Sequence, residues 1–317
     1  MNSIAVVGGH QLTWASRTDV GKVRKVNEDS LMAADGLFVV ADGMGGHAAG
    51  DVASQLTVAS FVDRMSSGPL PIANLAGVIE HANATVMDHA RDHHRQGMGS
   101  TLVGVALADN GGAPNLVVFH VGDSRCYVSD DEGVRQVTRD HSEVQELVDR
   151  GEITAEEATT HPHRNVVTRA IGIDPAVFPD FVVLGPAASR RLMLCSDGVS
   201  GEVSFHDIER LLLDVTRTPD EVAEQLMALV LAGRAADNAS LIVVDVLQTD
   251  AALDDDVDVT GPRARSLDRA PDPGMHTEPE VPLAEDVPGI IVDVPAMESG
   301  LDSRHDDRPD VIDDVPS

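Results

Sequence analysis

The stretch Val39-Val40-Ala41-Asp42-Gly43-Met44-Gly45-Gly46-His47 ends an apolar run on a single carboxylate and then turns through glycines. The apolar run predicts a buried strand with Asp42 at its C-terminal end. Glycine allows backbone conformations and close approaches that other residues do not. The stretch therefore predicts one acid presented beside a backbone that an ion can approach closely.

Asp123, Asp197 and Asp237 each stand next to an apolar, strand-like run, as Asp42 does. Taken singly, each is more simply explained as a turn acid or a helix cap. Four carboxylates at the ends of buried strands are harder to explain in that way, because those ends can meet at one edge of a sheet structure. Together they predict a shared metal centre.

The composition allows a large core and excludes some partners. With 317 residues and 42% hydrophobic content, the chain can form one large domain or two small ones, and the low aromatic content of 3% predicts an aliphatic core. The formal net charge of -30 argues against binding to nucleic acid or to an anionic membrane, since both need basic surfaces. We expect a monomer that binds neither.

The two cysteines, Cys126 and Cys195, lie in apolar, strand-like runs, so a disulfide framework is not expected and a reducing compartment is the simplest setting. The chain has no uninterrupted apolar stretch of about 18 residues. Residues 1–10 lack a basic segment before their short apolar run, which argues against a secretory signal. These features predict a cytoplasmic protein.

A change in composition divides the chain at about residue 248. Residues 251–317 hold 18 acidic and 5 basic residues, 9 of the 17 prolines, and no Phe, Tyr or Trp. Such a segment buries too little apolar surface to offset its chain entropy, so residues 249–317 are predicted to be a disordered tail. Its one apolar island, residues 289–294, could add as a strand to a partner's sheet; the alternative is a solvated tail with no docking.

Hydrophobic patterns in residues 1–248 predict an α+β fold with central antiparallel sheets covered by helices. The turn-prone segments Asn110-Gly111-Gly112 and Asp131-Glu132-Gly133 favour hairpins over crossover connections. The polar stretch 138–169 predicts two short helices and an exposed segment. Strands are expected over 11–18, 30–34, 37–41, 100–108, 115–121, 125–129, 134–137, 178–184, 192–195 and 239–247, and longer helices over 47–65, 72–94, 204–213 and 219–231.

Arg24 precedes the adjacent acids Glu28 and Asp29 by four and five residues. A guanidinium near carboxylates is a useful arrangement if a phosphate must be held beside a metal ion. The alternative is a surface turn whose charges neutralise one another, which is the usual outcome for such a run.

Seven stretches, in this order, resemble the metal-dependent (type 2C) serine/threonine protein phosphatases, in particular their compact bacterial members. They are Asp19–Ser30, Val40–His47, Met98–Leu102, Val121–Arg125, Val167–Gly172, Cys195–Gly198 and Asp237-Asn238. They span nearly all of residues 10–248. The resemblance implies an α-β-β-α sandwich of two mainly antiparallel sheets, a catalytic domain over 1–248, and a flap beside the active site over 138–169.

The resemblance also implies a set of metal-binding positions. They are Glu28, Asp29, Asp42, Gly43, Asp123, Asp197 and Asp237. Asp42 bridges two divalent cations, Asp197 and Asp237 complete the first, and the Gly43 carbonyl serves the second. Glu28 and Asp29 hold water around the ions, and Asp123 is the ligand for a third, looser ion. Ligand sets made only of oxygen suit Mg²⁺ or Mn²⁺ rather than zinc, in agreement with the family.

The implied reaction is the hydrolysis of phosphoserine or phosphothreonine by a water that two metal ions activate. By the resemblance, Arg24 binds the outer oxygens of the phosphate. For His47 two roles stay open, either protonation of the leaving group or shaping of the loop at the start of a helix. The implied partners are phosphorylated proteins and a serine/threonine kinase whose action the enzyme reverses in a bacterial cytosol.

Two other functions compete with an active phosphatase. One is a catalytically weak pseudophosphatase that binds phosphoproteins in a regulatory role, and the other is a cation-binding regulatory domain without phosphate chemistry. The second leaves Arg24 without a purpose. The presence of Asp42, Asp197, Asp237 and Glu28 together favours catalysis.

Overall fold

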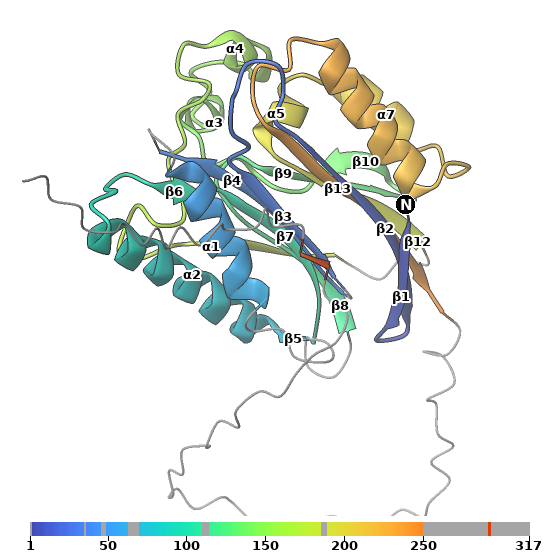
Figure 1. Ribbon diagram of the computed structural model, residues 1–317. Helices are drawn as coiled ribbons and strands as arrows, with labels where there is room; N and C mark the ends of the chain where they lie inside the picture. Colours follow the sequence, from blue (N-terminus) through green and yellow to red (C-terminus); the bar gives the residue numbers. More distant parts are fainter. Residues whose placement is uncertain are drawn as a thin grey trace, which may run out of the picture.

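The computed structural model of the chain describes residues 2–34, 36–45, 49–62, 70–109, 114–184, 189–249 and 291–292. In these ranges two β-sheets face each other and helices cover their outer faces (Figure 1). His47 and nearly all of the predicted tail lie outside them, so the division of the chain at residue 248 stays a prediction.

The first sheet is antiparallel throughout and contains six strands. In spatial order they are β1 (Ser3–Val7), β2 (His10–Asp19), β13 (Ala239–Gln248), β12 (Ser189–Cys195), β9 (Arg125–Asp130) and β10 (Gly133–Gln136). The predicted hairpin after Asp130 is confirmed, since β9 and β10 pair directly around the turn at residues 131 and 132. Strand β1 was not predicted; it is half-exposed, and its hydrogen bonds to β2 define it better than its sequence does.

The second sheet packs face to face against the first. In spatial order it contains β11 (Asp180–Leu184), β8 (Pro114–Val121), β7 (Leu102–Asp109), β4 (Leu37–Met44), β3 (Asp29–Ala34) and β14 (Ile291–Val292), with β5 (Leu70–Pro71) pairing beside β7 and β6 (Gly99–Ser100) beside β4. The pairs are antiparallel except β5 with β7. For the apolar island of the tail the sequence left open addition to a partner's sheet or no docking; its residues 291 and 292 pair through β14 with β3 of its own chain.

The helices form the two outer layers, which confirms the predicted α-β-β-α sandwich. Figure 1 shows α1 (Gly50–Val62) and α2 (Ile72–Asp92) over the second sheet, and α6 (Phe205–Leu212) and α7 (Pro219–Ala232) over the first, with the short α5 (Asp197–Ser200) following β12. The helices α3 (Glu143–Asp149) and α4 (Ala155–Thr160) lie at one end of the sandwich, as predicted for the flap. Side-chain caps start several helices; Thr218 and Glu221 form a capping box on α7.

The core has three apolar layers, one between the sheets and one under each pair of helices. The central layer is largely aliphatic, as the composition predicts, and contains one aromatic contact in which Trp14 and Phe38 meet edge to face with ring centroids 5.4 Å apart. It joins β2 of one sheet to β4 of the other. Through it, β4, the strand that carries Asp42, is anchored to both sheets.

For the first helix the sequence predicts an apolar face through Val52, Leu56, Ala59 and Val62, which is confirmed in part: Val52, Leu56 and Val62 pack half-buried against the core, whereas Ala59 is exposed. The residues that α1 buries fully are offset by about one position along the helix and are small or polar at several points. The reason is that α1 lies closely against β3 and β4, where Ser54 donates a hydrogen bond to the Glu28 carbonyl at 2.6 Å. For α2 the sequence predicts an apolar face, which is confirmed because all of its residues lie in the core: Leu75, Val78, Ile79, Ala82 and Val86.

Replacing Phe38 by alanine should lower the free energy of unfolding by about 3 to 5 kcal/mol, because the side chain is 1% exposed and its removal leaves a cavity between the sheets. Urea denaturation followed by circular dichroism measures the change. The matched control is Phe178→Ala, whose ring is 69% exposed and should change stability by less than about 1 kcal/mol. Similar losses in both variants would contradict the packing described above.

Candidate active site

A cavity of about 340 Å³ opens at the edge of the sandwich where β4 and β12 end and β13 begins. It brings together most of the predicted site residues, although they lie far apart in the sequence. Those that line it are Arg24, Glu28, Asp42, Gly43, Asp123, Asp197 and Asp237. Asp29 is buried beside them. Thr101, Asn165 and Val167 also line the cavity; the quoted motifs contain Thr101 and Val167 without a role, and nothing in the sequence signalled Asn165.

The β3–β4 hairpin places two acids opposite each other, since Asp29 and Asp42 are direct partners across the strands. Past this pair, the Gly43 amide donates to the Glu28 carbonyl at 3.1 Å. A Cβ atom on Gly43 would lie 2.0 Å from the Gly50 carbonyl oxygen, so any side chain would displace the start of α1. Glycine is therefore required at position 43 because the backbone of Gly50 approaches it closely.

Thr101 fixes the backbone of Asp42. The Asp42 amide donates to the Thr101 hydroxyl at 3.1 Å, and the Thr101 amide donates to the Asp42 carbonyl at 2.8 Å. The same hydroxyl lies 2.7 Å from that of Ser124, which follows Asp123 in the chain. One buried threonine thus links the positions of two predicted metal ligands.

Asn238 has a similar role for the segment that carries Arg24 and Glu28. Its side-chain oxygen accepts from the Glu28 amide at 2.8 Å, and its side-chain nitrogen donates to the carbonyls of Val20 and Val26, each at 3.0 Å. Because Asn238 directly follows Asp237, these bonds place the Arg24 segment over that carboxylate.

Asp29 presents an unused hydrogen-bond acceptor. Its side chain is 6% exposed; Oδ2 accepts from Ser196 at 2.8 Å, whereas the buried Oδ1 has no hydrogen-bond partner among the described residues. Burial raises the pKa of Asp29 to about 7. A buried acceptor without a donor is costly, so this atom fits a site that gains water and a cation.

The carboxylates raise one another's pKa values. Burial, followed by the nearby charges of Asp29 and Asp197, raises the pKa of Asp42 well above its ordinary range. Burial is also the main cause for Asp123, whose pKa rises to about 7, and for Asp197, whose pKa also rises. The donor set consists of oxygen atoms, which fits Mg²⁺ or Mn²⁺, and a cation would relieve the repulsion.

Arg24 forms an ion pair with one of the predicted ligands. Its Nη2 lies 2.8 Å from Asp237 Oδ2, and its Nη1 lies 4.0 Å from Glu28 Oε2. The hydrogen bond to Asp237 is the main reason that the pKa of Arg24 is raised. The side chain is about half exposed at the rim of the cavity, so the guanidinium is within reach of an incoming anion.

A family model described as protein phosphatase 2C matches residues 22–232, which include the described site residues except Asp237. The chain belongs to the protein phosphatase 2C family. This confirms the family resemblance found in the sequence, and the fold described above agrees with it.

Curated relatives from bacteria match the same region. Serine/threonine protein phosphatase PstP of Mycobacterium tuberculosis is 38% identical over 244 residues, which are 75% of this chain and 46% of PstP. This chain thus spans about half the length of that relative. Serine/threonine phosphatase stp of Listeria monocytogenes is 34% identical over 241 residues, which are 72% of this chain and 94% of stp.

Solved structures of family members share the fold. The crystal structure of the catalytic domain of PstP, in complex with two manganese ions, is 38% identical, with a TM-score of 0.67 over 75% of this chain and 99% of that one. Among the described residues of this phosphatase 2C family member, no helix is long and apolar enough to cross a membrane.

A second group of side chains, His120, His141 and Asp180, has ligand atoms that all lie within 4.8 Å of one another. No trio of acids in the cavity converges as tightly in the part of the chain that the structure describes. A metal does not fit this group, however, because His141 Nδ1 already accepts from the Gly122 amide at 3.1 Å. Its Nε2 must then carry the proton, and Arg169 Nη1 lies 3.2 Å from that atom.

In metal-free protein, Asp29→Asn should stabilise the fold more at pH 8 than at pH 5. An unfolded Asp titrates near about 4, whereas the pKa of Asp29 in the fold is about 7. Between these values the folded state binds more protons, so the contribution of Asp29 to stability falls as the pH rises. Asparagine removes this pH-dependent contribution. The melting temperatures of variant and wild type, recorded in EDTA at both pH values, measure the difference.

The lowered pKa values of His120 and His141 make stability change with pH in the opposite direction. Comparing the variant with wild type at each pH removes their contribution, because both proteins contain these histidines. With excess Mn²⁺ at pH 8, wild type should become more stable than Asp29→Asn, because wild type then gains ligand-binding energy. An equal effect of Asp29→Asn at both pH values in EDTA would contradict the raised pKa.

Proposed function

We propose that this chain is a metal-dependent protein serine/threonine phosphatase that hydrolyses phosphoserine and phosphothreonine. The observation that carries the proposal is the set of mutually repelling carboxylates around an open cavity with Arg24 at its rim. Family membership and the manganese in the PstP structure support it. When bound, two Mn²⁺ or Mg²⁺ ions would lower the pKa of a water and neutralise charge on the phosphate.

The side chains that would hold the ions are assigned by the family resemblance, and their gathering in one cavity supports the assignment. Asp42, at the centre of the acids, would bridge both, with Asp197 and Asp237 on the first and the Gly43 carbonyl on the second. Glu28 and the unpartnered Oδ1 of Asp29 would accept hydrogen bonds from water around the ions. Asp123 would hold a third, looser ion.

Arg24 would bind the outer oxygens of the substrate phosphate, by exchanging part of its contact with Asp237 for the anion. No cysteine competes with water as the nucleophile. Cys126 and Cys195 are buried, and burial raises the pKa of the Cys195 thiol to about 12 and that of Cys126 further, so neither is a thiolate at neutral pH. Protonation of the leaving group by His47 stays a prediction, because His47 lies outside the described residues.

The substrates we propose are cytoplasmic proteins phosphorylated on serine or threonine, and the implied partner is the kinase that modifies them. A regulatory pseudophosphatase would keep the same cavity and bind the phosphoprotein without turnover. Direct measurement of phosphate release distinguishes the two.

Asp42→Asn and Asp197→Asn should each lower kcat/KM by more than about 100-fold, since even residues outside the ligand sphere often contribute 10- to 100-fold. The assay follows hydrolysis of an aryl phosphate and of a phosphothreonine peptide, with Mn²⁺ or with EDTA. The control is Asp92→Asn, an exposed acid on α2. A wild-type protein that releases no phosphate with Mn²⁺ would refute the enzyme, and unaffected variants would refute the ligand assignment.

Arg24→Ala should raise KM by about tenfold or more, the loss expected for a charge-assisted hydrogen bond, and lower kcat less. The reason is that a group that binds the phosphate equally in substrate and transition state affects KM alone. Lys25→Ala, an exposed neighbour of the same charge, is the control and should leave both constants unchanged. Equal falls in kcat and kcat/KM would assign Arg24 to the transition state instead.

A further inference from the structure

His141 lies where the flap segment, residues 138–169, leaves the first sheet. Its side chain is only 4% exposed and does not line the cavity. It nevertheless contacts the loop that carries Asp123, the far end of the flap segment and β11. No feature of the sequence had singled it out.

The first contact is with Gly122, the residue before Asp123. His141 Nδ1 accepts from the Gly122 amide at 3.1 Å, and the His141 amide donates to the Gly122 carbonyl at 2.9 Å. Gly122 has a φ of 105°, and a Cβ there would lie 2.8 Å from Thr101. Both polar groups of Gly122 are therefore bonded to one residue, at a position where only glycine fits without strain.

The second contact closes the flap segment at its base. The His141 carbonyl accepts from the Thr168 amide at 2.8 Å, and the next residues pair in the same way, with the Glu143 amide donating to the Val166 carbonyl at 2.9 Å. Asn165 and Val167, which line the cavity, lie within this closed end. The wall of the cavity on that side depends on the same junction.

Other side chains hold the ring of His141 in one orientation. Because Nδ1 accepts a bond, Nε2 carries the proton and faces Asp180 Oδ2 at 3.2 Å, and Arg169 Nη1 holds Asp180 Oδ1 at 3.2 Å. His120 stacks on the ring with centroids 4.6 Å apart. Burial lowers the pKa of His141, which agrees with a neutral ring.

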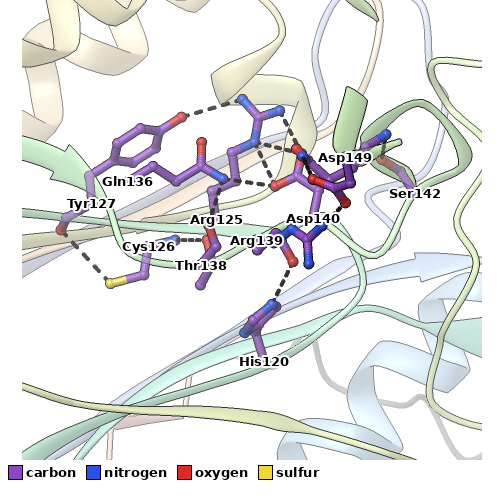
Figure 2. Close-up of polar contacts among 11 residues, drawn as sticks. His120, Arg125, Cys126, Tyr127, Gln136, Thr138, Arg139, Asp140, Ser142 and Asp149 are labelled. Carbon is purple, nitrogen blue, oxygen red and sulfur yellow. Dashed lines mark hydrogen bonds and ion pairs between the residues drawn. The ribbon is translucent and has the colours of Figure 1, made fainter. Parts of the chain in front are cut away.

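Figure 2 shows how the residues just before His141 are held. His120 Nε2 bonds the Arg139 carbonyl at 2.9 Å, and Arg125, two residues after Asp123, forms a forked ion pair with Asp140 at 2.6 to 3.1 Å. The loop of Asp123 is thus tied to the start of the flap segment on both of its sides. The ion pair stabilises the junction, but among the described residues only His141 bonds Gly122.

We propose that His141 is a positioning residue, which sets the place of Asp123 and of the flap segment through its bond to the Gly122 amide. The proposal rests on the proposed phosphatase function, in which Asp123 holds the loosest ion. Loss of the Nδ1 bond leaves the Gly122 amide buried without an acceptor, which releases the loop. Binding of the ion at Asp123 then weakens, while Asp42 and its neighbours stay in place.

Two substitutions separate the two ends of the ring. Asparagine retains an acceptor near the place of Nδ1 and loses the contact with Asp180, whereas glutamine reaches toward Asp180 and abandons Gly122. His141→Gln should raise the Mn²⁺ concentration for half-maximal activity by about tenfold or more, as expected for a residue that orients a ligand. His141→Asn should stay within about threefold of wild type. His206→Gln, at a side chain that is 83% exposed, is the matched control.

Hydrogen exchange of metal-free protein tests the bond without relying on activity. The segment containing residues 121–124 should exchange at least about tenfold faster in His141→Gln than in wild type, and at nearly the wild-type rate in His141→Asn. If His141→Gln does not fold, Asp180→Ala serves instead, because Asp180 is half exposed and bonds the ring of His141 without contacting Gly122. Asp180→Ala should raise the Mn²⁺ concentration for half-maximal activity and speed exchange in residues 121–124, each by a smaller factor than His141→Gln does.

Wild-type protein that is inactive with Mn²⁺ would overturn the phosphatase function and this inference with it. Active wild type together with a His141→Gln variant that matches His206→Gln in both readouts would overturn the positioning role alone. Equal defects in His141→Asn and His141→Gln would also overturn it, since the bond to Gly122 would then not be the one that matters.

Discussion

Repulsion among buried carboxylates is the constraint on which the rest of this structure depends. Asp29 and Asp42 face each other across one hairpin, and Asp197 adds its charge from the other sheet. Burial and mutual repulsion raise their pKa values, so the site favours protons or cations. A fold that keeps such acids together must fix each of them by bonds other than their own, and the apolar layers of the sandwich supply that rigidity.

Neutral polar residues make most of those bonds. Thr101 forms hydrogen bonds with the backbone of Asp42. Asn238 bonds the Glu28 amide and so connects that segment to the strand that follows Asp237. Gly43 lets the start of α1 approach the hairpin. Each of these residues could be replaced without changing the net charge of the cavity, yet each replacement would move a carboxylate. The chemistry we propose thus relies on residues that take no part in it.

The flap segment is joined to this site at its base. The Arg125–Asp140 ion pair and the bonds of His141 connect the loop of Asp123 to both ends of the flap segment. A displacement of the flap segment would therefore be felt first at Asp123, which follows β8, two strands away from β4 in the second sheet. That arrangement allows substrate contacts on the flap segment to influence the loosest proposed ion while leaving Asp42 in place.

The sequence by itself determined the family, the α+β sandwich and the acids that meet in the cavity, because an acid beside glycine or asparagine at the end or start of a short apolar run is recognisable without tertiary context. It also predicted most strands and the buried face of α2. Only the tertiary structure decided the face of α1, the pairing of β14 with β3, the ion pair of Arg24 with Asp237 and the junction at His141. These depend on contacts between residues distant in sequence, whose geometry no local periodicity or spacing contains. Asn165 likewise reached the cavity because the flap segment folds back on itself.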